Sequence, residues 1–338
     1  MNKKILIIGP SWLGDMIMAQ ALFKTLKSRF DCVIDVVASE WSGAILDRME
    51  EVNKSIIIPI NHGELALLSR YKLAKQLRSE GYDQAIILTN TWKSALVPFL
   101  AKIPQRTGWL GELRCGLLND VRYLDKKKLP TLMQRYVALA YSKAEEMPSE
   151  HALPRLMVQQ QLVQKTLNKF NITGESDKKI LALCPGAAFG SAKRWPEDYF
   201  AAVAKEKIKA GWEVWLFGSK QDEPITMQVQ QQLPQNYRNF AGKLQLGETV
   251  DLMSVVDVVI SNDSGLMHMA SSLNKYLIAI YGSTSPVFTP PFGSNATILA
   301  ENLPCSPCFK RVCPLKHHQC MKAITPEQVL GLMDKDGW

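Results

Sequence analysis

Short continuous apolar runs recur along the whole chain, and each run ends at a turn of small or polar residues. The runs cover 4–9, 33–38, 56–60 and 84–89 in the first half, and 180–184, 213–217, 256–261 and 276–281 in the second. Apolar residues that follow one another without alternation indicate strands buried on both faces, as in a parallel sheet covered by helices. The chain is therefore expected to have an α/β fold.

Amphipathic stretches fill the spaces between these runs. The stretch 15–29 places Ile17, Ala21, Leu22, Thr25 and Leu26 on one helical face, and 64–80 repeats the pattern with Leu65, Leu68, Leu73 and Leu77. A chain of 338 residues is long enough for two domains, and the segment 147–154, with two prolines, is a plausible linker. We expect domains over 1–155 and 156–338.

The charge balance favours anionic partners. Forty basic residues against thirty-two acidic ones give a net charge of +8, which suits phosphorylated substrates, a membrane surface or nucleic acid. Lys3 and Lys4 precede an apolar stretch that is too short for a signal peptide, and no run approaches the ~20 apolar residues of a membrane helix. We expect a cytoplasmic protein whose membrane contact, if any, is made at the surface.

The turn 261–268 is the most informative polar segment, because it separates the apolar run 255–260 from a new helix. Free backbone N–H groups at such a helix start bind anions, and ligands of doubly wound sheets lie at this edge. Asp263 within the turn suits hydroxyl groups better than phosphate, since a carboxylate only accepts hydrogen bonds. A ligand with both phosphate and hydroxyls, such as a sugar nucleotide, fits.

Two other turns carry charged side chains. The turn 9–15 lacks the glycine spacing of a dinucleotide fingerprint and the Lys-Ser/Thr of a P-loop, but it ends on Asp15. Asp15 either caps the following helix or acts as a general base. Lys193 and Arg194 precede a helix that begins near Pro196, where they are either solvated charges or phosphate contacts.

Four cysteines near the C-terminus raise a competing hypothesis. Cys305, Cys308, Cys313 and Cys320, with two histidines between the last two, have the density of a zinc site, although reduced thiols or a conditional disulfide fit as well. A basic zinc-containing nucleic-acid-binding protein is the main alternative, but basic residues and aromatics do not interleave in a stripe. A nucleotide-dependent oxidoreductase is weaker, because the glycine fingerprint is missing.

The combined motifs resemble glycosyltransferase family 9. They are G-P-S-W-L-G-D-M at 9–16, P-G-A-A-F-G-S-A-K-R-W-P at 185–196, F-G-S at 217–219 and N-D-S-G-L-M-H at 262–268, with R-T-G-W at 106–109 and G-L-L-N-D-V-R at 116–122. The resemblance implies a GT-B fold, in which two Rossmann-like doubly wound parallel-sheet domains face a central cleft. The first domain would bind the acceptor and the second the sugar nucleotide.

The resemblance also implies a reaction. The enzyme would move L-glycero-D-manno-heptose from ADP-heptose onto the first heptose of the lipopolysaccharide inner core (heptosyl-Kdo2-lipid A), with inversion and without a metal or other cofactor. Asp15 would be the general base, Lys193 would face the diphosphate and Asp263 would hold heptose hydroxyls. Peripheral contact with the cytoplasmic face of the inner membrane is expected, and binding of nucleic acid is not.

Further site residues follow from the same resemblance. Ser264 and Gly265 would offer backbone N–H groups to phosphate, and Asp222 or Glu223 would accept hydrogen bonds from the ribose. Ser283 and Thr284 are lesser phosphate candidates, and the role of His268 stays open. The acceptor candidates are Lys93, Arg106, Arg114 and Arg122.

Overall fold

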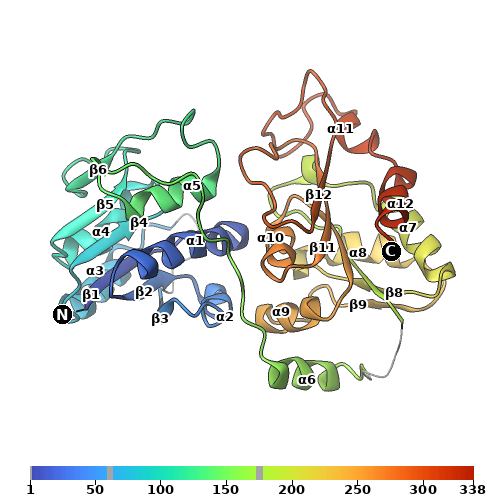
Figure 1. The fold of residues 1–338 in the computed structure, drawn as a ribbon, viewed down its shortest axis with the longest axis horizontal. Helices are drawn as coiled ribbons and strands as arrows, with labels where there is room; N and C mark the ends of the chain where they lie inside the picture. The colour runs from blue at the N-terminus through green and yellow to red at the C-terminus, as the bar shows by residue number, and fades with distance from the viewer. Residues whose placement is uncertain (1, 59–63, 173–177) are drawn as a thin grey trace. The chain divides into compact units, whose positions relative to one another are not determined.

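The protein has two compact α/β units. The computed structural model describes residues 2–58, 64–172 and 178–338, and the chain divides into Met1–Met157 and Val158–Trp338. This division lies two residues after the boundary expected from the sequence. Each unit contains a six-stranded sheet in which every pair of neighbouring strands is parallel (Figure 1). The expected α/β class with two parallel-sheet domains is confirmed.

The first sheet has the strand order β3-β2-β1-β4-β5-β6. Its strands are β1 (Lys3–Ile8), β2 (Cys32–Ala38), β3 (Val52–Ile57), β4 (Gln84–Ile87), β5 (Gln105–Trp109) and β6 (Asp120–Arg122). Its helices are α1 (Leu13–Arg29), α2 (Gly43–Leu46), α3 (Leu67–Arg78), α4 (Trp92–Leu100) and α5 (Leu132–Val137). Helix α1 packs on α5, and α3 packs on α4.

The second sheet has the corresponding order β12-β11-β10-β7-β8-β9. Its strands are β7 (Ile180–Cys184), β8 (Glu213–Leu216), β9 (Tyr237–Asn239), β10 (Val258–Asn262), β11 (Tyr276–Tyr281) and β12 (Ala296–Ala300). Its helices are α6 (Gln160–Lys169), α7 (Glu197–Lys209), α8 (Glu223–Gln230), α9 (Leu246–Ser254), α10 (Gly265–Ser272), α11 (Gln319–Lys322) and α12 (Pro326–Lys335).

The apolar runs form the central strands of both sheets, where burial on both faces requires them. Strands β1, β4, β10 and β11 are buried along most of their lengths. Strand β3 begins at Val52, four residues before the expected run, whose last two positions, 59 and 60, lie outside the described residues. The short strands β5, β6, β9 and β12 were not expected.

The expected apolar face of α1 is confirmed, since all five of its predicted residues are buried. The face predicted for 64–80 is wrong in its first half. Leu73 and Leu77 are buried, whereas Leu65 and Leu68 are exposed. Leu65 precedes the helix, and Leu68 lies nine residues before Leu77, which is two and a half turns and therefore the opposite side of α3.

The strand order brings the expected polar turns of the second domain together. Strands β11, β10, β7 and β8 are neighbours and parallel, so their carboxyl ends meet at one edge of the sheet. The turns at 282–284, 263–265, 185–188 and 218–219 follow these strands. Among the described residues, no helix is long and apolar enough to cross a membrane.

Candidate active site

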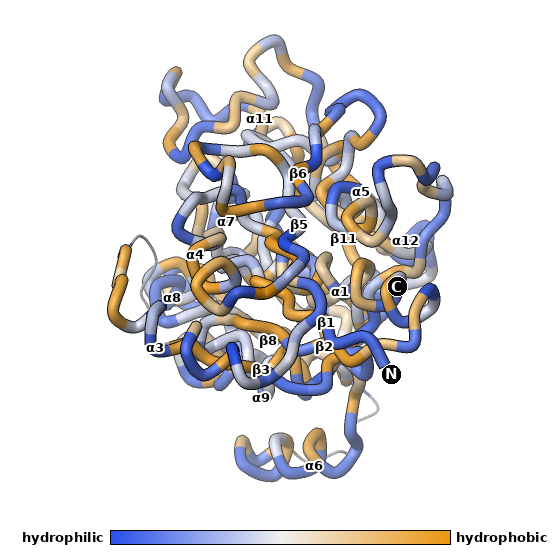
Figure 2. The backbone as a smooth tube through the Cα atoms, turned by 90° about the vertical axis from the view of Figure 1, so that its left-hand side faces the viewer, coloured by the Kyte–Doolittle hydropathy of each residue, from blue (hydrophilic) through white to orange (hydrophobic). Residues whose placement is uncertain are grey.

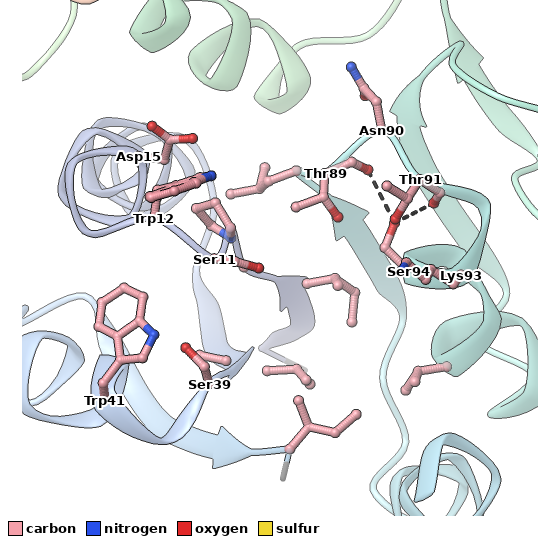
Figure 3. A pocket seen from close by; sticks show the side chains of 18 of the residues that line it. Ser11, Trp12, Asp15, Ser39, Trp41, Thr89, Asn90, Thr91, Lys93 and Ser94 are labelled. Atoms are coloured by element: carbon pink, nitrogen blue, oxygen red, sulfur yellow. Dashed lines mark hydrogen bonds between the residues drawn. The ribbon is translucent and has the colours of Figure 1, made fainter. Parts of the chain in front are cut away.

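A cavity of about 1180 Å³ opens at the carboxyl edge of the first sheet. It is lined by the segments that follow β1, β2 and β4, together with parts of α4 and α5. Figure 3 shows two groups of side chains across it: Trp12, Asp15, Ser39 and Trp41 on one side, and Asn90, Thr91, Lys93 and Ser94 on the other. Two sequence-predicted residues, Asp15 and Lys93, therefore line one pocket.

Asp15 lies in the first turn of α1, where the helix dipole favours a negative charge. The α1 N-cap residue, Trp12, makes no side-chain capping hydrogen bond to the helix. Tyr136 of α5 also lines the cavity, and its pKa is raised well above the usual value by burial and by the nearby Asp15 charge. The Tyr136 phenol is therefore neutral at pH 7.

The three arginines proposed for the acceptor do not line this cavity. Arg106 donates to the carbonyls of Ile103 and Leu117, and Arg122 forms an ion pair with Asp120 at 2.8 Å. Both contacts hold the β5–β6 edge of the sheet.

Arg114 is fully buried, which removes it from any surface where an acceptor could bind. Its guanidinium donates to the Thr89 carbonyl at 2.6 Å, to Asn90 Oδ1 at 3.0 Å and to the Trp109 carbonyl. Burial also lowers the pKa of the Arg114 guanidinium. The side chain fixes the turn after β4, and so acts on the cavity only through Thr89 and Asn90, which line it.

The second domain joins three predicted residues from three separate motifs. Lys193 Nζ lies 2.7 Å from Asp263 Oδ2, and Thr284 Oγ1 donates to the same oxygen. Asp263 is 4% exposed, so this ion pair is largely shielded from water. We call Lys193, Asp263 and Thr284 the donor-site cluster, after the role predicted for them from the sequence.

The chain around Lys193 is fixed by Asn262, the last residue of β10. Asn262 Oδ1 accepts from the Trp195 N–H at 2.9 Å, and its amide donates to the Pro185 carbonyl at 2.7 Å. Trp195 is itself fully buried and donates through its indole to the Ile324 carbonyl. The position of Lys193 beside β10 therefore rests on a satisfied buried network, which favours one geometry.

Hydrogen-bond donors surround this cluster. Ser264 is the N-cap of α10, and the first N–H groups of a helix have no partner within it. Ser283 Oγ is buried and has no hydrogen-bond partner among the described residues. His268 is also buried, and burial lowers its pKa to about 4, so the ring is neutral at pH 7. The carboxyl edge of the second sheet thus offers uncharged hydrogen-bond donors beside one ion pair.

Asp222 and Glu223, the two ribose candidates, have different surroundings. Asp222 accepts from the Ser219 N–H at 2.9 Å and from the Ser219 hydroxyl at 2.7 Å, in a capping box. The Glu223 side chain lies against Gly242, where a Cβ would come within 1.9 Å of Glu223 Oε1, so the missing side chain leaves space for the carboxylate. Both of these bonds go to Oδ2 of Asp222 and leave its Oδ1 available, whereas neither oxygen of the Glu223 carboxylate has a hydrogen-bond partner among the described residues, so Glu223 keeps more acceptor capacity for a ligand.

The cysteine-rich segment does not form a metal site in the described structure. Within residues 2–58, 64–172 and 178–338, no three His, Cys, Asp or Glu side chains are grouped so that they could hold a metal ion. Backbone N–H groups of 315–318 lower the pKa of the Cys313 thiol, while burial and the three other thiols raise that of Cys320. The zinc hypothesis therefore gains no support from the geometry.

Comparison with known proteins resolves the alternatives. The model of glycosyltransferase family 9 (heptosyltransferase) matches residues 70–319. The chain belongs to glycosyltransferase family 9. The predicted resemblance is thus confirmed, and so is the expectation of a glycosyltransferase.

Within family 9, the chain is clearly similar to heptosyltransferases 2, which agrees with the heptose transfer that the resemblance implied. The chain is 44% identical over 337 residues to lipopolysaccharide heptosyltransferase 2 of Escherichia coli K12, covering 97% of this chain and 96% of that protein. It is 45% identical to lipooligosaccharide heptosyltransferase 2 of Haemophilus influenzae Rd, covering 98% of both. The structure of E. coli ADP-heptose LPS heptosyltransferase II matches with a TM-score of 0.88 and 41% identity over 98% of both chains, and supports the GT-B assignment.

Several side chains of this family 9 protein that line the first-domain cavity were not predicted as site residues. Among them are Trp41 after β2, Arg70 of α3 and Tyr136 of α5. Arg70 donates to the carbonyls of Leu65 and Lys93, so it ties the segment before α3 to the start of α4. The position of Trp41 just after an apolar run was the one usable signal, whereas Arg70 and Tyr136 lie inside helices.

Proposed function

We propose that this chain transfers L-glycero-D-manno-heptose from ADP-heptose onto the first heptose of the lipopolysaccharide inner core. The observation that carries the proposal is the donor-site cluster, found in a chain 44% identical to lipopolysaccharide heptosyltransferase 2. A diphosphate sugar presents negative charge and hydroxyl groups together. The Lys193 ammonium and the start of α10 can bind the negative charge, and the Asp263 carboxylate can accept from the hydroxyl groups.

The second domain is the proposed donor-binding half. Lys193 and the first N–H groups of α10 would face the diphosphate, with the unpartnered Ser283 hydroxyl as a further donor. Lys193 and Thr284 both bind Oδ2 of Asp263, so its Oδ1 is left to accept from a heptose hydroxyl. Glu223, rather than Asp222, would accept from the ribose hydroxyls.

The first domain is the proposed acceptor-binding half, with Asp15 as the general base. The Asp15 carboxylate would take the proton from the attacking acceptor hydroxyl while its oxygen bonds to the anomeric carbon. The bond from that carbon to the diphosphate breaks on the opposite side, and ADP leaves with the electron pair, so the configuration inverts. Charge grows on the leaving diphosphate, where fixed donors stabilise the transition state more than the ground state.

The cavity walls suit an anionic sugar acceptor. Trp12 and Trp41 are 43% and 37% exposed, and aromatic faces of this kind pack against the apolar faces of sugar rings. Lys93 brings a positive charge to the same cavity for the carboxylates or phosphates of the inner core. Arg106 and Arg122 instead support the β5–β6 edge, and Arg114 supports the turn after β4.

We further propose that the start of α3 contacts the anionic cytoplasmic face of the inner membrane. Leu67, Leu68 and Tyr71 are more than half exposed, and Lys72 and Lys75 are exposed beside them. Figure 2 shows a hydrophobic stretch of the tube next to α3. Exposed apolar side chains beside cations match a surface of anionic lipid.

A product assay tests the transferase proposal. Purified protein is given ADP-heptose and Kdo2-lipid A that bears either no heptose or one, and products are read by mass spectrometry. We expect one added heptose on the acceptor that already carries one, and none on the other. Transfer to the heptose-free acceptor alone, or to neither, would overturn the proposed function.

Vesicle binding tests the membrane contact separately. The Leu67→Ser/Leu68→Ser variant should lose most binding to phosphatidylglycerol-containing vesicles while keeping its turnover of a delipidated acceptor. Leu113→Ser, at a residue 94% exposed elsewhere in the domain, is the matched control and should bind like the wild type. Equal binding by the two variants would remove α3 from the contact.

A further inference from the structure

The charge balance of the donor-site cluster leaves the diphosphate without a net positive partner. The Lys193 ammonium is paired with the Asp263 carboxylate at 2.7 Å, so their charges cancel. His268 adds no charge at pH 7, because burial lowers its pKa to about 4. A nucleoside diphosphate is strongly anionic, and its binding calls for a further cation at this edge.

Phe189 brings a second cation to Lys193. The Lys193 ammonium lies 5.1 Å from the centre of the Phe189 ring, and the Arg311 guanidinium lies 5.6 Å from the same centre. The Arg311 side chain is exposed, and it has no hydrogen bond or ion pair with another described residue. Both cations thus contact one ring, which places the Arg311 guanidinium near the Lys193 loop.

The backbone of Arg311 is held against the Lys193 loop. The Ala192 N–H donates to the Arg311 carbonyl at 3.0 Å. Gly190 has a φ of +153°, and a Cβ added there would lie 2.2 Å from the same carbonyl oxygen, so only glycine permits this approach. The two segments therefore keep a fixed spacing.

The segment that contains Arg311 is also hydrogen-bonded to the turn after β11. The Phe309 N–H donates to the Ser283 carbonyl at 2.7 Å, next to Thr284 of the donor-site cluster. Residues 309–311 are thus bonded both to the loop before Lys193 and to the turn after β11. This explains how an otherwise irregular segment, between Cys308 and Cys313, presents a side chain at a defined place.

We infer that Arg311 is a second donor-binding cation, which contacts the diphosphate of the bound nucleotide together with Lys193. The inference rests on the proposed function, since it names a further residue for the same donor. A guanidinium presents its donors in a rigid planar fork that matches two phosphate oxygens, a geometry that a lysine ammonium lacks.

The inference is tested by calorimetry of nucleotide binding to the full-length protein. Arg311→Ala should weaken ADP binding at least tenfold and AMP binding much less, since AMP lacks the second phosphate. Arg311→Lys should recover part of the ADP affinity. The control is Lys310→Ala, which removes an exposed charge from the neighbouring position and should leave both affinities unchanged.

The outcomes separate this inference from the proposed function. If the wild type binds ADP and Arg311→Ala binds it equally well, or loses ADP and AMP affinity to the same extent, Arg311 is not a diphosphate ligand. If the wild type binds no ADP, the proposed function itself fails. Thermal unfolding of each variant distinguishes lost binding from lost folding, and an unchanged melting temperature is expected because the guanidinium is exposed.

Discussion

Removing one charge of the donor-site cluster should destabilise the protein by an amount set by burial. The Lys193 and Asp263 side chains are only 14% and 5% exposed, and the pair measures 2.7 Å. Breaking a buried pair by removing one partner costs about 3–5 kcal/mol, because the other charge stays buried without compensation. Since Lys193 keeps some contact with water, we expect about 3 kcal/mol for Asp263→Asn and a similar loss for Lys193→Met.

The double variant should lose far less than the sum of the two single variants. Once both charges are gone no buried charge is unpaired, so we expect a coupling energy of about 2 kcal/mol or more. Denaturant unfolding followed by tryptophan fluorescence measures it, because Trp195, Trp212 and Trp215 are all buried in the same domain.

The chain offers a matched control for this comparison of single and double variants. Lys209 and Glu206 also lie 2.7 Å apart, but they are 72% and 52% exposed. An exposed pair on a helix surface contributes no more than about 0.5 kcal/mol. Additive losses at the buried pair, or equal coupling at the two pairs, would refute the claim that burial gives the donor-site pair its strength.

Three further predictions concern single side chains. Asp15→Asn should lower heptose transfer by about 10²–10⁴-fold while ADP-heptose affinity, measured by calorimetry, stays nearly constant, because the proposed base would act on the acceptor; near-normal turnover would refute this role. Glu223→Gln should weaken ADP binding severalfold, whereas Asp222→Asn should mainly lower the melting temperature by weakening a capping box; the reverse result would assign the ribose to Asp222. His268, with its pKa lowered from 6.5 to about 4, stays neutral in the folded state while the unfolded chain takes up a proton. This difference contributes about 3 kcal/mol to the free energy of unfolding above pH 6.5, and the contribution is lost as the pH falls toward 4. His268→Gln should therefore make the free energy of unfolding less dependent on pH over that range. An unaltered pH dependence would contradict the burial argument.

The central strands could be predicted from the sequence because burial on both faces requires unbroken apolar residues. Strand β11 was predicted with its observed bounds, and β7 likewise. The strands that were missed contain many polar or exposed residues, as in the segments QRTGW, DVR and YRN of β5, β6 and β9. Strands at or next to a sheet edge do not need two apolar faces, so no continuous apolar run marks them.

The misplaced leucines have a related cause. The stretch 64–80 satisfies a helical pattern in more than one register, and the sequence does not say where the helix begins. The structure starts α3 at Leu67 and turns Leu73 and Leu77 inward, which leaves Leu68 exposed. Only the neighbouring sheet and α4 select the face that is buried.

The order of apolar runs, turns and helices along the chain was sufficient for the fold class, the family and the edge of each sheet where charged side chains gather. Those conclusions depend on local patterns, which consecutive residues determine. The partners of each side chain depend on contacts between segments far apart: Lys193 with Asp263, seventy positions later, and the Arg114 guanidinium folded back into the turn after β4. Strand order and side-chain packing set those distances, so the tertiary structure alone distinguishes a charge that is exposed from one that is already paired.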